Sequence, residues 1–200
     1  YLIRGQQDPA TPLYSAATGH LSSLHWSGSA LSAQVDTNGV RELVIWPLTD
    51  GAFAATYRTA ISGELIGASG YQAFIQQGNT IIALSFTGDS FVPMVGYGIN
   101  GNIIGTASDQ GRVFVLTSTE LVVLQIAEED FLTLKPVHTE AFTENQYQGI
   151  WVEQGYAALW NADQVSVYTV DQSADLVLDY SVNSVGGEIQ QAVFDDEVLW

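Results

Sequence analysis

Carboxylates are the residues through which this sequence could do chemistry, because its 200 residues include 22 Asp and Glu and no cysteine. A pair of carboxylates supports glycoside cleavage, in which one acts as an acid and the other as a base or nucleophile. With so many acidic residues some pair must lie close together, and the sequence does not single one out. The absence of cysteine excludes disulfides, thiolate metal sites and cysteine nucleophiles.

The sequence gives weaker support for a metal site or for a serine nucleophile. The loops 36–39 and 171–175 offer some of the oxygen ligands that calcium needs, but neither has the alternating ligands and final Glu of an EF-hand. His20, His25 and His138 lack the spacing of a zinc site, and no serine stands in a GxSxG elbow. We therefore expect no catalytic residue, no metal and no cofactor, with calcium as the alternative. The sequence favours a protein that is not an enzyme.

An internal repeat must position these side chains. Residues 111–126 (GRVFVLTSTELVVLQI) and 155–170 (GYAALWNADQVSVYTV) align without a gap at an offset of 44, and each reads as a strand, a polar turn and a strand. Four further pairs extend the alignment: Gly105 with Gly149, Gln110 with Gln154, Leu132 with Leu176, and Leu134 with Leu178. Several short strands in a unit of roughly 40 to 45 residues are typical of a propeller blade.

The rest of the chain reads as less regular copies of this unit. A first unit, 21–61, has four strand signals and two tight-turn dipeptides, Asn-Gly and Asp-Gly. A second unit, 70–101, is shorter, because its Gln77-Gly78 turn aligns with Gln110-Gly111 at an offset of only 33. Part of a strand or loop is therefore expected to be missing there. A fifth unit begins at Gln190.

We predict an all-β fold: a β-propeller of four-stranded antiparallel blades, about five of them, in a single domain over 1–200. The chain is either a small closed ring or part of a longer one. In a closed ring the strand-like segment 1–5 would complete the last blade beside 197–200 and remove the exposed edges. A fragment, incomplete at both ends, is slightly favoured because both termini fall in strand-like sequence. The rival fold, an array of β-sandwiches, has units of about 100 residues.

The segment 19–48 resembles a WD40 repeat, and the chain resembles the WD40-like and PQQ-like groups of propellers in degenerate form. The matching residues are the Gly19-His20 pair, Trp26-Ser27-Gly28, Asp36 in the following turn and Ile45-Trp46 at the end of the third strand. In the WD40 family the His, the turn Asp and the Trp form a buried hydrogen-bonded network. The resemblance therefore implies that His20, Asp36 and Trp46 are structural. Pro47 stands where the family has Asp, and the other units lack both signatures.

Propellers bind through loops at one end of the ring, and the loops between second and third strands are expected to carry one carboxylate per unit. These residues are Asp36, Asp89, Glu120 and Asp163. Converging negative charges would attract a metal ion or a basic segment of a partner. Hairpin turns also favour Asp for backbone reasons, and that explanation needs no ligand.

The opposite end of the ring is expected to be more acidic still, and its acidic residues read as a solvated face. They are Asp50, Asp109, Glu128, Glu129, Asp130, Glu153, Asp171, Asp175, Asp195, Asp196 and Glu197.

The charge balance limits the partners, because only five Lys and Arg oppose the acids and the formal net charge is −17. Such a field repels phosphate backbones and anionic lipids, so we expect no nucleic-acid partner and no membrane insertion. Acidic surfaces also keep proteins in solution in salty surroundings. We expect an extracellular or cell-envelope location, with the cytoplasm of a salt-adapted organism as the alternative.

The leading functional hypothesis is a non-enzymatic interaction or scaffold domain that binds a protein partner, with a basic partner suited to the charge. The alternative is a carbohydrate-active propeller, either a glycoside hydrolase or a lectin, with carboxylates at the channel mouth. The tryptophans that could stack on sugars are Trp26, Trp46, Trp151, Trp160 and Trp200. Trp160 aligns with Leu116 and Trp151 with Ala107, which favours core packing. The oligomeric state is left open.

Overall fold

The computed structural model describes residues 19–53, 56–127, 133–184 and 187–192, together with the short strands at 194–195 and 198–199. Within these ranges every regular element is a β-strand, which confirms the all-β prediction. Several predicted features lie outside the described residues: the strand 1–5, the acidic residues 128–130, Asp196, Glu197 and Trp200. No helix in the described ranges is long and apolar enough to cross a membrane.

The first sheet corresponds to the first repeat unit. Its strands are β1 (Gly19–Trp26), β2 (Ala30–Thr37), β3 (Val40–Thr49), β4 (Ala52–Phe53) and β5 (Tyr57–Ala60). Strands β1, β2 and β3 pair in sequence order, and β4 and β5 both pair with β3. The four strand signals predicted over 21–61 are therefore confirmed, with the fourth present as β4 and β5.

The second sheet is complete, so the prediction of a missing strand or loop is wrong. Its strands are β6 (Glu64–Ser69), β7 (Gln72–Gln77), β8 (Thr80–Phe86), β9 (Phe91–Pro93) and β10 (Tyr97–Gly98). Strands β6, β7 and β8 pair in sequence order, and β9 and β10 both pair with β8. The predicted unit, 70–101, begins after β6 and therefore does not include this strand.

The repeat is more even than the sequence alignment indicated. The turn that joins the first two strands of the second sheet is Gly70-Tyr71, which is therefore the counterpart of Gln110-Gly111. The Gln77-Gly78 turn joins the second strand to the third and has a different position in the unit. Successive first turns, represented by Gly28, Tyr71, Gly111 and Gly155, are 43, 40 and 44 residues apart.

The third and fourth sheets have the same four-stranded antiparallel order. The third consists of β11 (Ile103–Asp109), β12 (Arg112–Thr117), β13 (Glu120–Ile126) and β14 (Leu134–Ala141). The fourth consists of β15 (Gly149–Glu153), β16 (Tyr156–Trp160), β17 (Gln164–Val170) and β18 (Leu176–Asn183). Two further short strands, β19 (Phe194–Asp195) and β20 (Val198–Leu199), pair with each other. Strand β14 runs to Ala141, so the polar segment 139–148 begins as a strand.

The offset of 44 holds for the first three strands of these two sheets and fails in the fourth. Gly105 faces Leu116 as Gly149 faces Trp160, which agrees with the alignment. In the last strands, however, Leu134 faces Ile126 and Leu176 faces Val170. Leu134 is therefore the counterpart of Leu176 and not of Leu178, because the connection that precedes it is two residues longer.

Four hairpin turns use the backbone conformation that the Asn-Gly and Asp-Gly dipeptides predicted. Both residues of each turn have a positive φ, between 48° and 82°. This is the mirror-image turn whose twist suits paired strands, and glycine in second place adopts it without a side-chain clash. The turns are Asn38-Gly39, Asp50-Gly51, Gln110-Gly111 and Gln154-Gly155.

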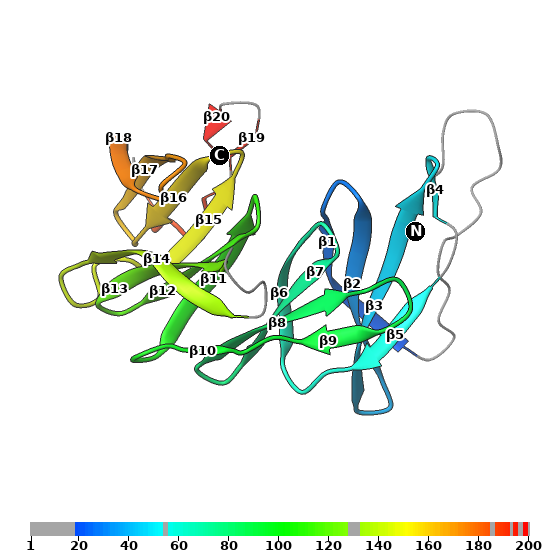
Figure 1. Cartoon of the computed structure of the whole chain (residues 1–200). Helices are drawn as coiled ribbons and strands as arrows, with labels where there is room; N and C mark the ends of the chain where they lie inside the picture. Colours follow the sequence, from blue (N-terminus) through cyan, green and yellow to red (C-terminus); the bar gives the residue numbers. More distant parts are fainter. Residues whose placement is uncertain are drawn as a thin grey trace.

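The four sheets follow one another through the molecule in sequence order (Figure 1). The first strands of neighbouring sheets touch: β1 contacts β6, β6 contacts β11, and β11 contacts β15. Apolar clusters fill the layers between the sheets, such as Leu43 with Ile75, Phe74 with Val115, and Phe114 with Ile150. Strands covered on both faces need apolar residues on both faces, which explains the nearly continuous burial of β2 and β12.

The two ends of this stack are named here after their turns. The first-turn end carries the turns between first and second strands and the loops between third and fourth strands, and the second-turn end carries the turns between second and third strands. The Ser27 hydroxyl donates to the Gly70 carbonyl at 2.7 Å, and the Gly155 N–H donates to the Asp109 carboxylate at 2.9 Å. First turns of neighbouring sheets therefore lie side by side.

Candidate functional site

The four acidic residues predicted to form a binding face do not share one end of the stack. Asp36 lies near the end of β2, Glu120 begins β13, and Asp163 precedes β17, all at the second-turn end. Asp89 lies in the loop between β8 and β9, at the first-turn end, so its predicted position is wrong. The cause is the alignment of the second unit, which was shifted by one strand. Within the described ranges no three or more His, Cys, Asp or Glu side chains are placed to hold a metal ion.

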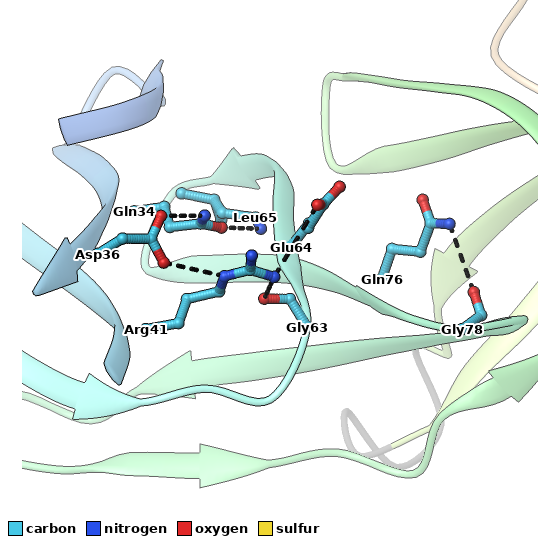
Figure 2. Close-up of polar contacts among 8 residues, drawn as sticks. All are labelled: Gln34, Asp36, Arg41, Gly63, Glu64, Leu65, Gln76 and Gly78. Carbon is cyan, nitrogen blue, oxygen red and sulfur yellow. Dashed lines mark hydrogen bonds and ion pairs between the residues drawn. The ribbon is translucent and has the colours of Figure 1, made fainter. Parts of the chain in front are cut away.

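Asp36 belongs to a network of polar contacts that joins the first two sheets (Figure 2). Its carboxylate accepts hydrogen bonds from the Gln34 amide at 2.9 Å and from Arg41 Nε at 3.1 Å. Arg41 also donates to the Gly63 carbonyl at 2.9 Å, and the Gln34 side-chain oxygen accepts from the Leu65 N–H at 3.0 Å. The network therefore holds the beginning of β6 against β2 and β3.

The charge of Asp36 is balanced within this network. The hydrogen bond from Gln34 has the largest effect on the pKa of the Asp36 carboxyl and lowers it, burial acts in the opposite direction, and Arg41 lowers it further. Arg41 also lies 3.9 Å from the exposed Glu64 carboxylate. The Asp36 carboxylate already accepts hydrogen bonds from protein donors. We therefore assign Asp36 a structural role in the contact between the two sheets and not a role in binding a partner.

Gln34→Ala is expected to lower the free energy of unfolding by about 2 kcal/mol. Gln34 is 5% exposed, and its loss leaves the buried Leu65 N–H without its acceptor and Asp36 without one donor. Urea unfolding measures the change. The matched control is Gln76→Ala, since the Gln76 amide donates to the Gly78 carbonyl on the exposed surface and its loss should cost less than about 0.5 kcal/mol. Equal losses in the two variants would contradict the role given to Gln34.

The structure differs from the buried His–Asp–Trp network that the WD40 resemblance implies. His20 faces Asp36 across the β1–β2 pair but is exposed, so it does not belong to a buried network. Trp46 is 2% exposed and packs in an apolar cluster with Leu31 and Val44. Trp46 is thus a core residue of the first sheet, and Asp36 works with Gln34 and Arg41.

The other two histidines lie in separate parts of the molecule. Burial lowers the pKa of His25, and a hydrogen bond to the Leu65 backbone opposes this effect. His138 Nδ1 lies 3.0 Å from an Asp175 carboxylate oxygen, which joins the outer strand of the third sheet to a loop of the fourth. These contacts link neighbouring sheets.

Three of the five tryptophans pack against the core, among them Trp151 and Trp160, for which the repeat alignment favoured core packing. Trp46 is buried, and Trp151 and Trp160 pack against a buried cluster that includes Ala158. Trp26 differs, because it is 55% exposed; its ring and that of Phe53 form a T-shaped pair with 6.2 Å between centroids.

A hollow of about 440 Å³ lies between the first and second sheets at the first-turn end, and the sequence analysis did not predict it. Its lining residues are Pro47, Thr49, Tyr57, Tyr71, Phe86, Thr87 and Gly88. The Tyr57 and Phe86 ring centroids are 4.5 Å apart, and those of Tyr71 and Phe86 are 6.2 Å apart. We call this the aromatic hollow.

A second hollow, of about 390 Å³, lies between the third and fourth sheets at the same end. Its lining residues are Gln110, Arg112, Gln154, Gly155, Tyr156, Thr169, Val170, Asp171 and Gln172. The Arg112 guanidinium donates to the Asp171 carbonyl at 2.8 Å and also to the Gln172 carbonyl. An arginine of the chain itself therefore borders this hollow, which we call the arginine hollow.

Two comparisons of the sequence, with family models and with curated proteins, gave no match. The function is therefore argued from the sheets, the two hollows and the charge.

Proposed function

We propose that the four sheets are blades of a β-propeller and that the domain holds a protein partner, without catalysis, at its first-turn end. Three features support the propeller: antiparallel sheets in sequence order, first strands that touch from one sheet to the next, and first turns spaced by 40 to 44 residues. This spacing is typical of blades that fan about one axis.

The observation that carries the proposed binding face is that both hollows open at the first-turn end. Each hollow is bordered by the first turn of the later of its two sheets and by the loop that follows the third strand of that same sheet. Loops on a rigid scaffold are where proteins most often bind their partners. The proposal therefore moves the binding face from the end that carries Asp36, Glu120 and Asp163 to the opposite end.

The partner that suits this face is basic. The chain carries a formal net charge of −17, which accelerates association with positively charged segments and repels nucleic acids. We place the domain outside the cell or in the cell envelope, with a salt-adapted cytoplasm as the alternative setting. A carbohydrate ligand at the same face is the competing outcome of the test below.

The test is selection of displayed peptides on the immobilised chain, followed by two variants. Thr87→Trp fills the aromatic hollow, and Thr119→Trp is the matched control because it changes an exposed threonine in a second turn. We expect enriched peptides to be basic and to bind the Thr87→Trp variant roughly tenfold more weakly, with Thr119→Trp unchanged. The proposal is overturned if no peptide is enriched, if only Thr119→Trp weakens binding, or if a glycan library binds at Thr87 in place of peptides.

A further inference from the structure

We infer that the aromatic hollow receives an arginine side chain from a basic segment of the partner. The inference rests on the proposed function and names the chemistry of one contact within it. It is carried by a comparison of the two hollows, which occupy equivalent places in the repeat.

The backbone pairing fixes which residues correspond in the two hollows. The Phe86 N–H donates to the Tyr71 carbonyl as the Val170 N–H donates to the Gly155 carbonyl. Phe86 is therefore the counterpart of Val170, and the next residues, Thr87 and Gly88, are the counterparts of Asp171 and Gln172.

These loop positions are the ones that an arginine contacts in the arginine hollow. There the carbonyls of Asp171 and Gln172 accept hydrogen bonds from Arg112 of the preceding sheet. In the aromatic hollow the same positions, Thr87 and Gly88, are part of the lining. The loop thus lines the aromatic hollow at the two positions whose counterparts in the fourth sheet bind a guanidinium.

The preceding sheet supplies no arginine to the aromatic hollow. Arg112 faces Gln125 in the third sheet, and Ala30 faces Pro47 in the first. The Leu48 N–H donates to the Ser29 carbonyl, as the Phe86 N–H donates to Tyr71 in the second sheet and the Val170 N–H to Gly155 in the fourth. Ala30 is therefore the counterpart of Arg112, and its methyl group cannot reach the loop.

The rings of the aromatic hollow suit a guanidinium better than a purely polar lining would. Phe86 is 7% exposed, and its ring lies near the rings of Tyr57 and Tyr71, of which Tyr71 is 42% exposed. A guanidinium is planar, is weakly hydrated and stacks on aromatic faces while its N–H groups donate to carbonyls. The two tyrosines and the loop backbone therefore offer both kinds of contact that arginine makes.

Charge at the hollow also favours a cation. No described lining residue is charged, and the lining residues Thr49 and Gly88 directly precede Asp50 and Asp89 in their loops. The nearest arginine in sequence, Arg58, follows Tyr57 on β5, where successive side chains point to opposite faces, and it lies 3.6 Å from the Glu42 carboxylate. A positively charged ligand therefore meets no competing cation from the lining.

The test uses the full chain with fluorinated tyrosines and a short probe, acetyl-Ser-Gly-Arg-Gly-Ser-amide, followed by ¹⁹F NMR. The comparison probe carries citrulline, which has the shape of arginine without its charge. We expect the arginine probe to shift the Tyr57 and Tyr71 signals and to bind roughly tenfold more tightly than the citrulline probe. Tyr71→Ala should weaken the arginine probe by roughly fivefold, and Tyr71→Phe should preserve its binding because the ring face remains.

Tyr180→Ala is the matched control, because Tyr180 is similarly exposed, at 38%, and lies on β18 far along the chain. Equal binding of the arginine and citrulline probes, tighter binding of a leucine probe, or equal sensitivity to Tyr180→Ala would each overturn the inference. Failure of the proposed function is recognised separately. If selected peptides depend on Thr87 but tolerate citrulline in place of arginine, the binding face stands and the arginine contact is wrong.

Discussion

Replacing Phe114 by alanine is expected to lower the free energy of unfolding by about 3–5 kcal/mol. Phe114 lies on β12, is 1% exposed, and packs in a cluster with Ile150 and Val152 of β15 and Leu159 of β16. Its removal loses the transfer free energy of a phenyl ring and leaves a cavity between the third and fourth sheets. Urea unfolding followed by tryptophan fluorescence measures the change.

Two controls separate this cavity from a general effect of substitution. Phe114→Leu keeps most of the buried volume and should cost less than about 1.5 kcal/mol. Val177→Ala removes an apolar side chain that is 59% exposed on β18 and should change stability by less than about 0.5 kcal/mol. A loss below about 1 kcal/mol for Phe114→Ala would contradict a shared core between these sheets.

The sequence predicted the third and fourth sheets well because their first three strands pair at the same spacing along the chain and are joined by the same turns. Gln110-Gly111 and Gln154-Gly155 adopt the same mirror-image turn, and the strands beside them hold the same register. Local turn chemistry and apolar pattern agree there, so a gapless alignment was enough. The fourth strands were misaligned because a longer connection changes the register only after the third strand.

The sequence did not predict strand β6 because its glycines weaken the strand pattern, and the need for these glycines comes from packing against other strands. Its segment contains Gly67, and Gly63 precedes it, which weakens the strand signal. A Cβ on Gly67 would lie 1.9 Å from the Ser108 hydroxyl of β11, and one on Gly63 would lie 2.2 Å from the Gln76 carbonyl. These glycines allow close approach of backbones and sheets, and that requirement appears only once the sheets are packed.

The aromatic hollow was also beyond sequence reasoning. Its rings come from β5, from the first turn of the second sheet and from the end of β8, so the chain brings them together only by stacking two sheets. One signal in the sequence pointed to an exposed aromatic ring. Tyr71 directly follows Gly70 in a turn, where neighbouring strands do not cover a large side chain. The acidic residues at turns did not indicate the binding face reliably, since Asp36 takes part in a contact between sheets.

Gly149→Ala is expected to lower the free energy of unfolding by up to about 3 kcal/mol. Gly149 faces Trp160 across the β15–β16 pair, and an added Cβ would lie 2.1 Å from the Trp160 ring. The ring must then move away from the surface it covers. The extra methyl cannot be accommodated by a small shift, because three atoms of the indole lie within 2.8 Å of it.

The third sheet provides a matched control at the equivalent position. Gly105 faces Leu116, and a Cβ there would lie 3.1 Å from the Cγ2 methyl group of Ile150, a tight contact but much less close than the one at Gly149. Alanine is also favoured over glycine in a strand by roughly 0.5–1 kcal/mol, which offsets the tighter contact. Gly105→Ala should therefore be nearly neutral under the same urea unfolding conditions.

A double substitution tests the cause directly. Gly149→Ala combined with Trp160→Leu reproduces a small residue beside leucine, as Gly105 lies beside Leu116 in the third sheet. If the indole causes the clash, the two changes must couple, and the double variant should be more stable than the sum of the single losses by about 1–3 kcal/mol. Simple additivity, or equal losses for Gly149→Ala and Gly105→Ala, would show that the Trp160 ring is not what requires glycine at position 149.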